Sequence, residues 1–458
     1  MVHKTEKENE SSLLRPGNEK PQVFERKQLR YKDLSTKFTI IKNDYSKQFA
    51  HVYAARLDEL RDVLITKVNA KWGNVSILKL ADLENFDGKE CVIIGTLYKH
   101  QQWKPSILRE LSEDHQLTLP QPRPDYCSEK DIPYLEDEML RIKLVGEQVD
   151  LKYIVTGVVC AILGHEEADG TFVVKDWCFP GCAPSASVSS GATKGKMVLL
   201  SGLDLANNAE SLAVSLLSEW LCGMAGNTTI QKEGTSIIRI IIAGNTVKSD
   251  TKVHSHMGHS AGKAQDNAIA KEIALATQNA DAFLYNIAQC CCLTLMPGEH
   301  DPTNIMLPQR PLHPCLLPKT SKYESFKSAT NPWIGRIGDR VLIGNSGQPI
   351  RDIMKASGET GISPIEWLEK TLFWRHICPT APDTLPSCPY YEKDLFIMKE
   401  CPDIYFVGNM DKFETKLCKG DENQVVRLIC VPQFSVTHTA VIVDLETLDT
   451  EHICFGSG

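Results

Sequence analysis

The chain has 458 residues, of which 42% are apolar and 24% are charged, an ordinary globular mixture that excludes a disordered or fibrous protein. It carries 50 basic and 58 acidic side chains, a net charge of −8, whereas a protein that coats nucleic acid broadly would be basic. The longest apolar stretch, residues 153–164, is too short to cross a bilayer, and the N-terminal MVHKTEKENE lacks the apolar core of a signal peptide. We therefore expect neither a membrane protein nor a secreted one.

The N-terminal third predicts a tail, a helix and a small barrel. Residues 1–42 are polar without a sustained period and are expected to form a tail or a surface arm. Between residues 43 and 72 apolar side chains recur every three to four positions, which predicts an amphipathic helix. Four short β-rich runs then predict the strands of an OB-type barrel, at 90–98, 140–146, 153–164 and 171–177. A Pro- and acid-rich insertion is expected at 101–138, between the first two strands. The helix and barrel together make a predicted domain at 43–182.

The small-residue segment APSASVSSGATKGK, residues 183–196, is interpreted as a linker to a second domain at 197–458. In that domain apolar strands alternate with helical segments, a pattern typical of an α/β layered domain. The predicted helices are 210–225 and 264–289. The predicted strands are 197–200, 237–243, 293–296, 341–343, 395–397, 404–407, 425–430 and 439–443.

The sixteen cysteines contain no C-x-x-C pair, and a zinc ribbon needs two such clamps. Cys178 and Cys182 are spaced C-x3-C but have no second clamp at ribbon spacing. The consecutive cysteines 290–292 point in different directions and cannot all face one metal ion. We expect the reduced, mostly buried thiols of an intracellular protein.

Three further segments resemble functional motifs but do not meet their requirements. Residues 191–196 are one residue short of phosphate-loop spacing, and Met197 stands where a magnesium-ligating hydroxyl should be. Ser346 lacks the second glycine of a nucleophile elbow and is interpreted as a turn residue. Three histidines lie in the Ser/His/Gly-rich segment 246–262, a composition typical of a loop, so metal binding is not expected there: His254, His256 and His259.

The strongest functional signal is a series of short polar or glycine-containing loops that follow the strands of the second domain. Ligands and catalytic groups gather at such strand ends in α/β proteins, because the strand backbone holds them rigidly. The loops are 201–205, 244–247, 298–304, 376–385 and 408–413.

The order of these loops resembles the calcineurin-like metallophosphoesterases, whose loops carry D-x-H, G-D-x-x-D, G-N-H-D/E, an isolated His and G-H-x-H. By this resemblance, Ser201 and Leu203 replace the Asp and His of the first motif. Asn245 and Lys248 replace the metal-bridging Asp and its later partner in the second. Asn409 and Asp411 replace the two His of the last motif. A neutral amide cannot supply the bridging charge that holds two divalent cations about 4 Å apart, and Leu203 cannot bind a metal at all. The resemblance therefore implies a dismantled site, with no catalytic, metal-binding or cofactor-binding residue.

Part of the phosphoesterase pattern is retained in the third and fourth loops. His300 and Asp301 keep the His and the acidic residue of the third motif, although Glu299 replaces its Asn, and His376 matches the isolated His. An alternative interpretation is therefore a metal-dependent phosphoesterase or nuclease that uses these four residues at a single-metal site.

An OB-type barrel before a degenerate phosphoesterase domain resembles the B (second) subunits of the eukaryotic replicative DNA polymerases. Long specific strings narrow the resemblance to the small regulatory subunits of DNA polymerase delta. They are WKPSILRELSEDH at 103–115, LEDEMLRIKL at 135–144, MPGEHDPTNIMLPQRPLHPCLLP at 296–318, RHICPTAPDTL at 375–385 and CPDIYFVGN at 401–409. The resemblance covers residue 45 to the C-terminus.

The resemblance implies a non-catalytic nuclear scaffold that acts in DNA replication and repair. Its partners would be the cysteine-rich C-terminal domain of the polymerase catalytic subunit and the third subunit of the complex. The sliding clamp would be contacted indirectly or weakly, and DNA at most indirectly. A third interpretation, single-stranded DNA bound on the barrel, would need exposed aromatic residues among basic ones. The strand at 153–164 offers neither beyond Tyr153, so we expect the barrel to pack on protein.

Overall fold

The computed structural model describes residues 25–39, 48–86, 88–104, 124–185, 193–248, 263–389 and 392–456, without the side chains of residues 263–270. The tail before residue 25, most of the segment 103–115 and the histidines 254, 256 and 259 lie outside these ranges. No helix among the described residues is both long and apolar enough to cross a membrane.

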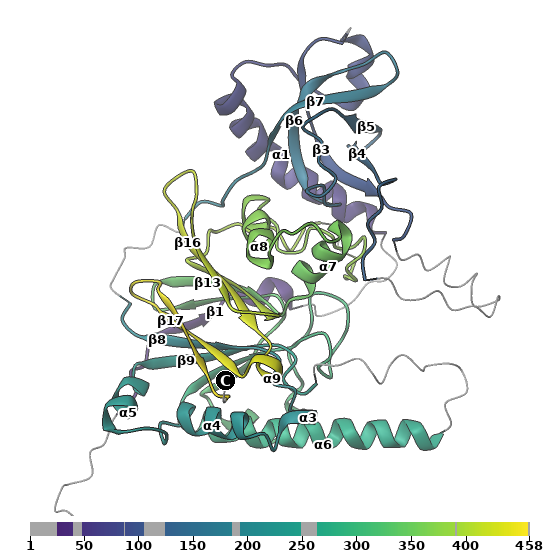
Figure 1. The fold of residues 1–458 in the computed structure, drawn as a ribbon. Coiled ribbons are helices and arrows are strands. Elements are labelled where there is room, and N and C mark those ends of the chain that lie inside the picture. The colour runs from purple at the N-terminus through teal and green to yellow at the C-terminus, as the bar shows by residue number, and fades with distance from the viewer. Residues whose placement is uncertain are drawn as a thin grey trace, which may run out of the picture.

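A helix and a closed barrel make one end of the molecule (Figure 1). Strand β3 pairs with both β4 and β6, and β5 pairs in parallel with β7, so the pairing runs in a ring. The elements are α1 (Ala50–Trp72), β2 (Ile77–Leu78), a 3-10 turn (Leu80–Asn85), β3 (Cys91–His100), β4 (Ile132–Glu136), β5 (Arg141–Val145), β6 (Val159–Glu166) and β7 (Thr171–Cys178). The predicted N-terminal helix and OB-like sheet are confirmed.

The barrel departs from the predicted strands at two places. Strand β4 lies inside the segment 101–138, which was expected to be an insertion, because its burial alternates like that of a strand with one face in the core. The predicted strand at 153–164 begins only at Val159, since the chain turns through Gly157, whose φ is +88°. An added Cβ at Gly157 would lie 2.0 Å from the Pro379 carbonyl oxygen, so no other residue fits this turn without a shift.

Two stacked sheets with helices on their outer faces make the α/β part (Figure 1). One sheet has the order β11 (Phe326–Ser328), β10 (Cys292–Met296), β9 (Ile237–Ala243), β8 (Lys196–Leu200), β17 (Thr439–Asp444) and β18 (Thr450–Cys454). The other has the order β1 (Tyr31–Asp33), β12 (Trp333–Ile337), β13 (Arg340–Asn345), β14 (Ile404–Met410), β16 (Val425–Pro432) and β15 (Glu414–Lys419). The α-helices are α3 (Leu205–Asn208), α4 (Leu212–Leu221), α5 (Thr228–Gly234), α6 (Lys263–Ala288), α7 (Gln348–Ser357), α8 (Pro364–Phe373) and α9 (Phe434–Thr437), with 3-10 turns at Ser35–Phe38, Pro314–Leu316 and Thr320–Lys322.

The centres of both sheets are parallel and almost fully buried, which explains why their strands read as continuous apolar runs. The segment 395–397, predicted as a strand, is not one, since Ile397 forms only an isolated bridge with His376. Strands β11, β12, β15 and β18 were not predicted, because they are short or lie near a sheet edge where fewer side chains are buried.

Residues 31–38, expected to belong to a tail or arm, are part of the second sheet. Strand β1 pairs antiparallel with β12, and the Ser35 hydroxyl lies 2.8 Å from the Ile334 amide, which donates to it. Phe38 is buried and stacks near Phe396 at 6.2 Å between ring centroids. This segment therefore joins the edge of the fold.

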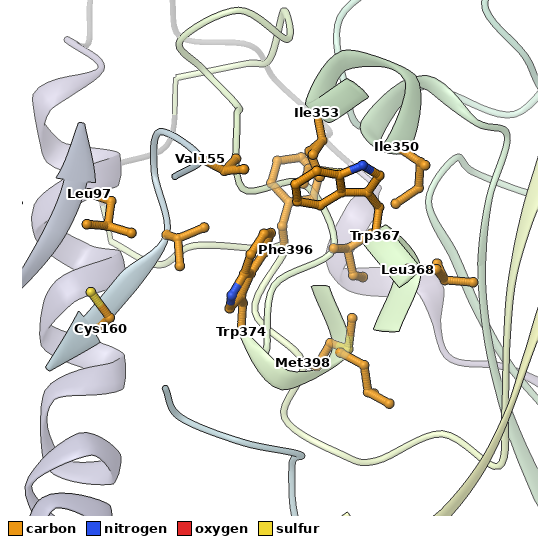
Figure 2. Packing of buried hydrophobic residues seen from close by; sticks show 14 of the residues in the cluster. Leu97, Val155, Cys160, Ile350, Ile353, Trp367, Leu368, Trp374, Phe396 and Met398 are labelled. Carbon is orange, nitrogen blue, oxygen red and sulfur yellow. The ribbon is translucent and has the colours of Figure 1, made fainter. Parts of the chain in front are cut away.

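One continuous apolar core joins the barrel to the α/β part. Leu97 and Val155 from the barrel side belong to the same buried cluster as Trp367 in α8 and Trp374, which directly follows that helix. Figure 2 shows Trp367, Trp374 and Val155 near Phe396, with Leu97 farther out on the barrel side. Because the two parts bury their apolar surface against each other, separating them would expose that surface to water.

A buried arginine on α1 reinforces this junction. Arg56 is fully buried, and its Nε donates to Asp394 Oδ2 at 2.6 Å. The same guanidinium donates to the carbonyl oxygens of Gly157, Pro379 and Ala381 at 2.8, 2.8 and 2.6 Å. Arg56 thus links the helix, a barrel loop and the α/β part through one set of charge-assisted hydrogen bonds.

Lys99 provides a second buried link. Its Nζ donates to the carbonyl oxygens of Leu151 and Ala356 at 3.0 and 3.1 Å, and Gln101 also donates to Ala356 at 2.9 Å. Ala356 lies in the last turn of α7, where carbonyl groups lack partners within the helix. Burial lowers the pKa of Lys99, while Cys127 and Asp131 oppose the change. The end of α7 is therefore anchored to barrel strand β3.

We predict that Arg56→Ala lowers the free energy of unfolding by roughly 3–5 kcal/mol, because it leaves Asp394 buried without its cation. Thermal and urea unfolding of the full chain would measure this change.

Arg61→Ala is the matched control, since Arg61 lies on the same helix and pairs with Glu138 at 3.3 Å on the surface. Its expected cost is below about 1 kcal/mol. If the two variants had equal melting temperatures, Arg56 would not stabilise the junction.

Candidate functional site

Three strands end in the polar loops that the sequence singled out. Ser201 follows β8, Asn245 follows β9 and Asn409 lies near the end of β14. The Asn409 amide N–H donates to the Ser201 hydroxyl at 2.8 Å, and its Nδ2 donates to the carbonyl oxygens of Ala243 and Ser346 at 3.0 and 2.8 Å. These loops lie together, because β8 and β9 are parallel neighbours whose carboxyl ends share one edge, and the end of β14 in the second sheet contacts them.

Neutral groups stabilise the backbone at this edge. The Ser201 hydroxyl donates toward the carbonyl oxygens of Val431 and Pro432, at 3.2 and 2.9 Å. Asn245 and Asn409 have φ values of +53° and +58°, a left-handed conformation that asparagine tolerates better than most residues. These side chains are committed to holding the loops.

Asn245 packs directly against the third loop. Its Oδ1 accepts the His300 amide N–H at 3.1 Å. A Cβ on Gly298 would lie 2.3 Å from the same oxygen, so only glycine fits beside it. Where the phosphoesterase pattern has a charged bridging ligand, this chain has an amide that bonds to backbone.

Asp301 is buried and accepts three backbone N–H groups. Its Oδ1 lies 2.8 Å from the Val247 nitrogen, and its Oδ2 lies 2.8 and 3.3 Å from the nitrogens of Gly298 and Thr246. Burial raises the pKa of Asp301, and these N–H groups oppose the rise. Asp301 therefore joins the second and third loops, and its carboxylate faces backbone donors.

The other positions carried over from the phosphoesterase pattern do not form a ligand set. Leu203 is fully buried, Asp411 and Glu299 are exposed, and Lys248 forms an ion pair with Glu272 at 2.9 Å. Among the described residues, no group of three His, Cys, Asp or Glu side chains is arranged to hold a metal ion.

His376 lies in the Arg56 network. Its Nδ1 accepts the Cys378 amide N–H at 3.2 Å, so its Nε2 carries the proton that is donated to Asp394 Oδ2 at 2.8 Å. Burial, together with the charge of Arg56, lowers the pKa of His376 to about 4. Burial would raise the pKa of Asp394, but Arg56 and His376 hold it well below its usual range. Of the four residues of the single-metal alternative, Asp301 and His376 are thus engaged in separate contacts, Glu299 is exposed and His300 is half-buried.

Ser346 and most of the cysteines are held inside the fold. Ser346 lies between β13 and α7 and donates its hydroxyl to the Pro297 carbonyl, as expected of a turn residue. The expectation of mostly buried cysteines is confirmed, since ten of the sixteen are buried, although Cys290 is exposed.

A cavity of about 710 Å³ lies beside these loops and was not predicted from the sequence. It is lined by Tyr126 from the segment before β4, Arg351 and Lys355 from α7, and Glu299 from the third loop. Arg351 also donates to the Asn409 carbonyl oxygen. No local pattern marks the cavity, because its walls come from segments far apart in the chain.

Comparison with known proteins identifies the family. Residues 48–177 match the model of the DNA polymerase delta subunit OB-fold domain, and residues 197–415 match that of the B subunits of DNA polymerases alpha and epsilon. The chain is 39% identical over 432 residues to DNA polymerase delta subunit 2 of Drosophila melanogaster, covering 94% of this chain and 98% of that protein. The chain belongs to the family of DNA polymerase delta small subunits.

Two more small subunits of DNA polymerase delta support this assignment. The Arabidopsis thaliana protein is 36% identical over 95% of this chain and 97% of its own length. The Saccharomyces cerevisiae protein is 31% identical over 90% of each chain. Membership of the polymerase delta small-subunit family makes this chain an accessory subunit in DNA replication.

The low pKa of His376 predicts a pH dependence of stability. The unfolded chain binds a proton on this residue below its ordinary pKa of 6.5, while the folded chain does so only below about 4. The contribution of His376 to the free energy of unfolding is therefore fully present above pH 6.5. It falls by roughly 3 kcal/mol as the pH drops from 6.5 toward 4.

Denaturant unfolding of His376→Gln should show a smaller loss of stability across this pH window than the native chain. His452→Gln, at an exposed position, is the matched control and should keep the native slope. An unchanged slope in His376→Gln would mean that His376 does not titrate in this window.

We predict that Asp301→Asn lowers the free energy of unfolding by about 1–3 kcal/mol, because the amide nitrogen must face a backbone N–H and leave it unpaired. Melting temperature measures this loss, and the stimulation of polymerase activity per folded complex should be retained. A loss of stimulation at an unchanged melting temperature would contradict the structural role.

Proposed function

We propose that this chain is a non-catalytic scaffold of the nuclear DNA polymerase delta complex in replication and repair. It joins the cysteine-rich C-terminal domain of the catalytic subunit to the third subunit. It contacts the sliding clamp indirectly or weakly, and DNA at most indirectly. Family membership supports its place in the complex. The observation that carries the non-catalytic assignment is the set of neutral side chains at the strand ends, which form hydrogen bonds to backbone groups.

The chemistry of a two-metal phosphoesterase is incompatible with these residues. Such a site holds its cations with anionic ligands and uses them to activate water and to stabilise charge on the phosphoryl group. Asn245 and Asn409 are neutral and bonded to backbone, and Asp301 accepts three N–H groups. A cation placed among them would have to displace contacts that hold the loops together.

The layers of the α/β part support the proposal that it is a degenerate calcineurin-like domain. Two sheets with parallel centres bury a shared core, and the loops in question project from the ends of their strands. We assign 43–182 to the helix and OB-type domain, 183–196 to the linker and 197–458 to the phosphodiesterase-like domain. Residues 1–42 form an N-terminal segment, of which 31–38 join the edge of that domain's second sheet. The buried contacts of Arg56 make the two domains one scaffold.

The proposed function predicts simultaneous binding of two partners without hydrolysis. The purified chain should bind the catalytic subunit's C-terminal domain and the third subunit in one ternary complex, observed by size-exclusion chromatography with light scattering. In the presence of Mn²⁺ or Mg²⁺ it should not cleave single-stranded DNA or a chromogenic phosphodiester.

Two results would overturn the proposal. Mutual displacement of the two partners would show that they share a surface. Metal-dependent cleavage that disappears in His300→Ala would instead favour the enzymatic alternative.

A further inference from the structure

Helix α4 lies on the surface of the molecule and carries apolar side chains beyond the face that packs on the sheet. Its inner face buries Ala213, Val214, Leu217 and Leu221 against the sheet and α6. A surface helix normally keeps its apolar residues in one stripe that faces the core. In α4 further apolar side chains lie outside that stripe, so the helix has a second apolar surface that the described residues leave exposed.

The outer face of α4 carries a stripe of apolar side chains spaced four residues apart. Leu212 is 72% exposed, Leu216 is 38% exposed and Met224, just beyond the helix, is 66% exposed, with the half-buried Trp220 between them. We call these four residues the α4 stripe. Its three helical members, from Leu212 to Trp220, span roughly 12 Å at the helical rise of about 1.5 Å per residue, the length of about two turns of a partner helix.

The apolar surface continues from the stripe toward the C-terminal strand. The Trp220 ring lies 5.6 Å from that of Phe455, which in turn lies 6.1 Å from Phe434 at the start of α9. In the same short helix Val436 is 70% exposed. Figure 1 shows α4, α9 and the C-terminal end on the same side of the molecule. Phe434 is fully buried, so the exposed apolar side chains are those of the stripe and Val436, with the half-buried Phe455 beside Trp220. A group of exposed apolar side chains on one side of a molecule is typical of an interaction site.

The charge at the border of the stripe is acidic. Glu210 precedes the helix and Glu219 lies beside Trp220; both are exposed, and neither forms an ion pair within the described residues. The nearby Arg26 donates to the Leu221 carbonyl oxygen at the end of the helix, so its guanidinium is directed at α4 itself. A partner that covers the stripe would therefore gain from basic side chains opposite the two glutamates.

We propose that the α4 stripe docks a basic amphipathic helix from another subunit of the polymerase complex. That helix would place apolar residues at i, i+3 or i+4 and i+7 against Leu212, Leu216 and Trp220, with Lys or Arg toward Glu219. This inference rests on the proposed scaffold function and specifies one of its two binding surfaces. Helix-in-groove recognition of this kind takes its affinity from a few apolar anchors and its orientation from the flanking charges.

The test uses the full chain with the purified catalytic and third subunits, each titrated separately. The variant Leu212→Ser/Met224→Ser should raise the Kd for one of the two subunits by about 100-fold or more and leave the other unchanged. Both side chains are largely exposed, so the melting temperature of the free chain should not fall. Glu219→Lys should weaken binding to the same subunit more at low salt than at high salt, whereas Glu219→Gln should have a smaller effect.

Met139→Ser/Leu417→Ser is the matched control, since these apolar residues are 83% and 45% exposed on the barrel and on β15. It should bind both subunits with native affinity. If the native chain binds both subunits and the stripe variant does so equally well, the docking proposal is wrong while the scaffold function stands. If the native chain binds neither, the scaffold function itself fails. If the free chain is a dimer that only the stripe variant dissociates, the stripe binds a second copy, which would also overturn the proposal.

Discussion

The buried guanidinium of Arg56 is the contact on which the arrangement of the molecule depends. It takes one carboxylate and three carbonyl groups as partners, and these come from the barrel loop and from two segments of the α/β part. An arginine without these partners could not remain buried, because removing its charge from water costs more than any single contact returns. The position of α1, the turn at Gly157 and the chain around Asp394 are therefore mutually dependent.

The same network sets the hydrogen bonding and the neutral state of His376. In the phosphoesterase pattern an isolated histidine would face a metal ion, but here the ring donates to Asp394 and stays neutral because it is buried beside a cation. A side chain of the type that binds metals serves instead to orient the carboxylate that holds Arg56. The chemistry of the histidine is thus used for the stability of the domain junction.

At the strand ends, too, side chains stabilise the fold at positions where catalytic groups could lie. The rigid edge that could position catalytic groups is intact, and Ser201, Asn245 and Asn409 occupy it with short neutral side chains. These groups satisfy buried carbonyl and amide groups, which would otherwise be costly to leave without partners. Asp301 does the same for three N–H groups, so hydrogen bonds to backbone join the second and third loops.

The sequence by itself determined the fold class, the long helices, the buried strands of the α/β part and the loops at their ends. Apolar periodicity is a local property, so it can be read wherever a segment is long and one face or both are buried, as in β9 and α6. The resemblance to the phosphoesterase loops also indicated that Asn245 lacks the charge of a bridging ligand. Short edge strands such as β1 were missed, because their pairing depends on a partner about 300 residues away and leaves little local pattern. Only the tertiary structure placed Arg56 beside Asp394, formed the cavity near Glu299 and left the outer face of α4 uncovered, since each of these depends on which distant segments meet in space.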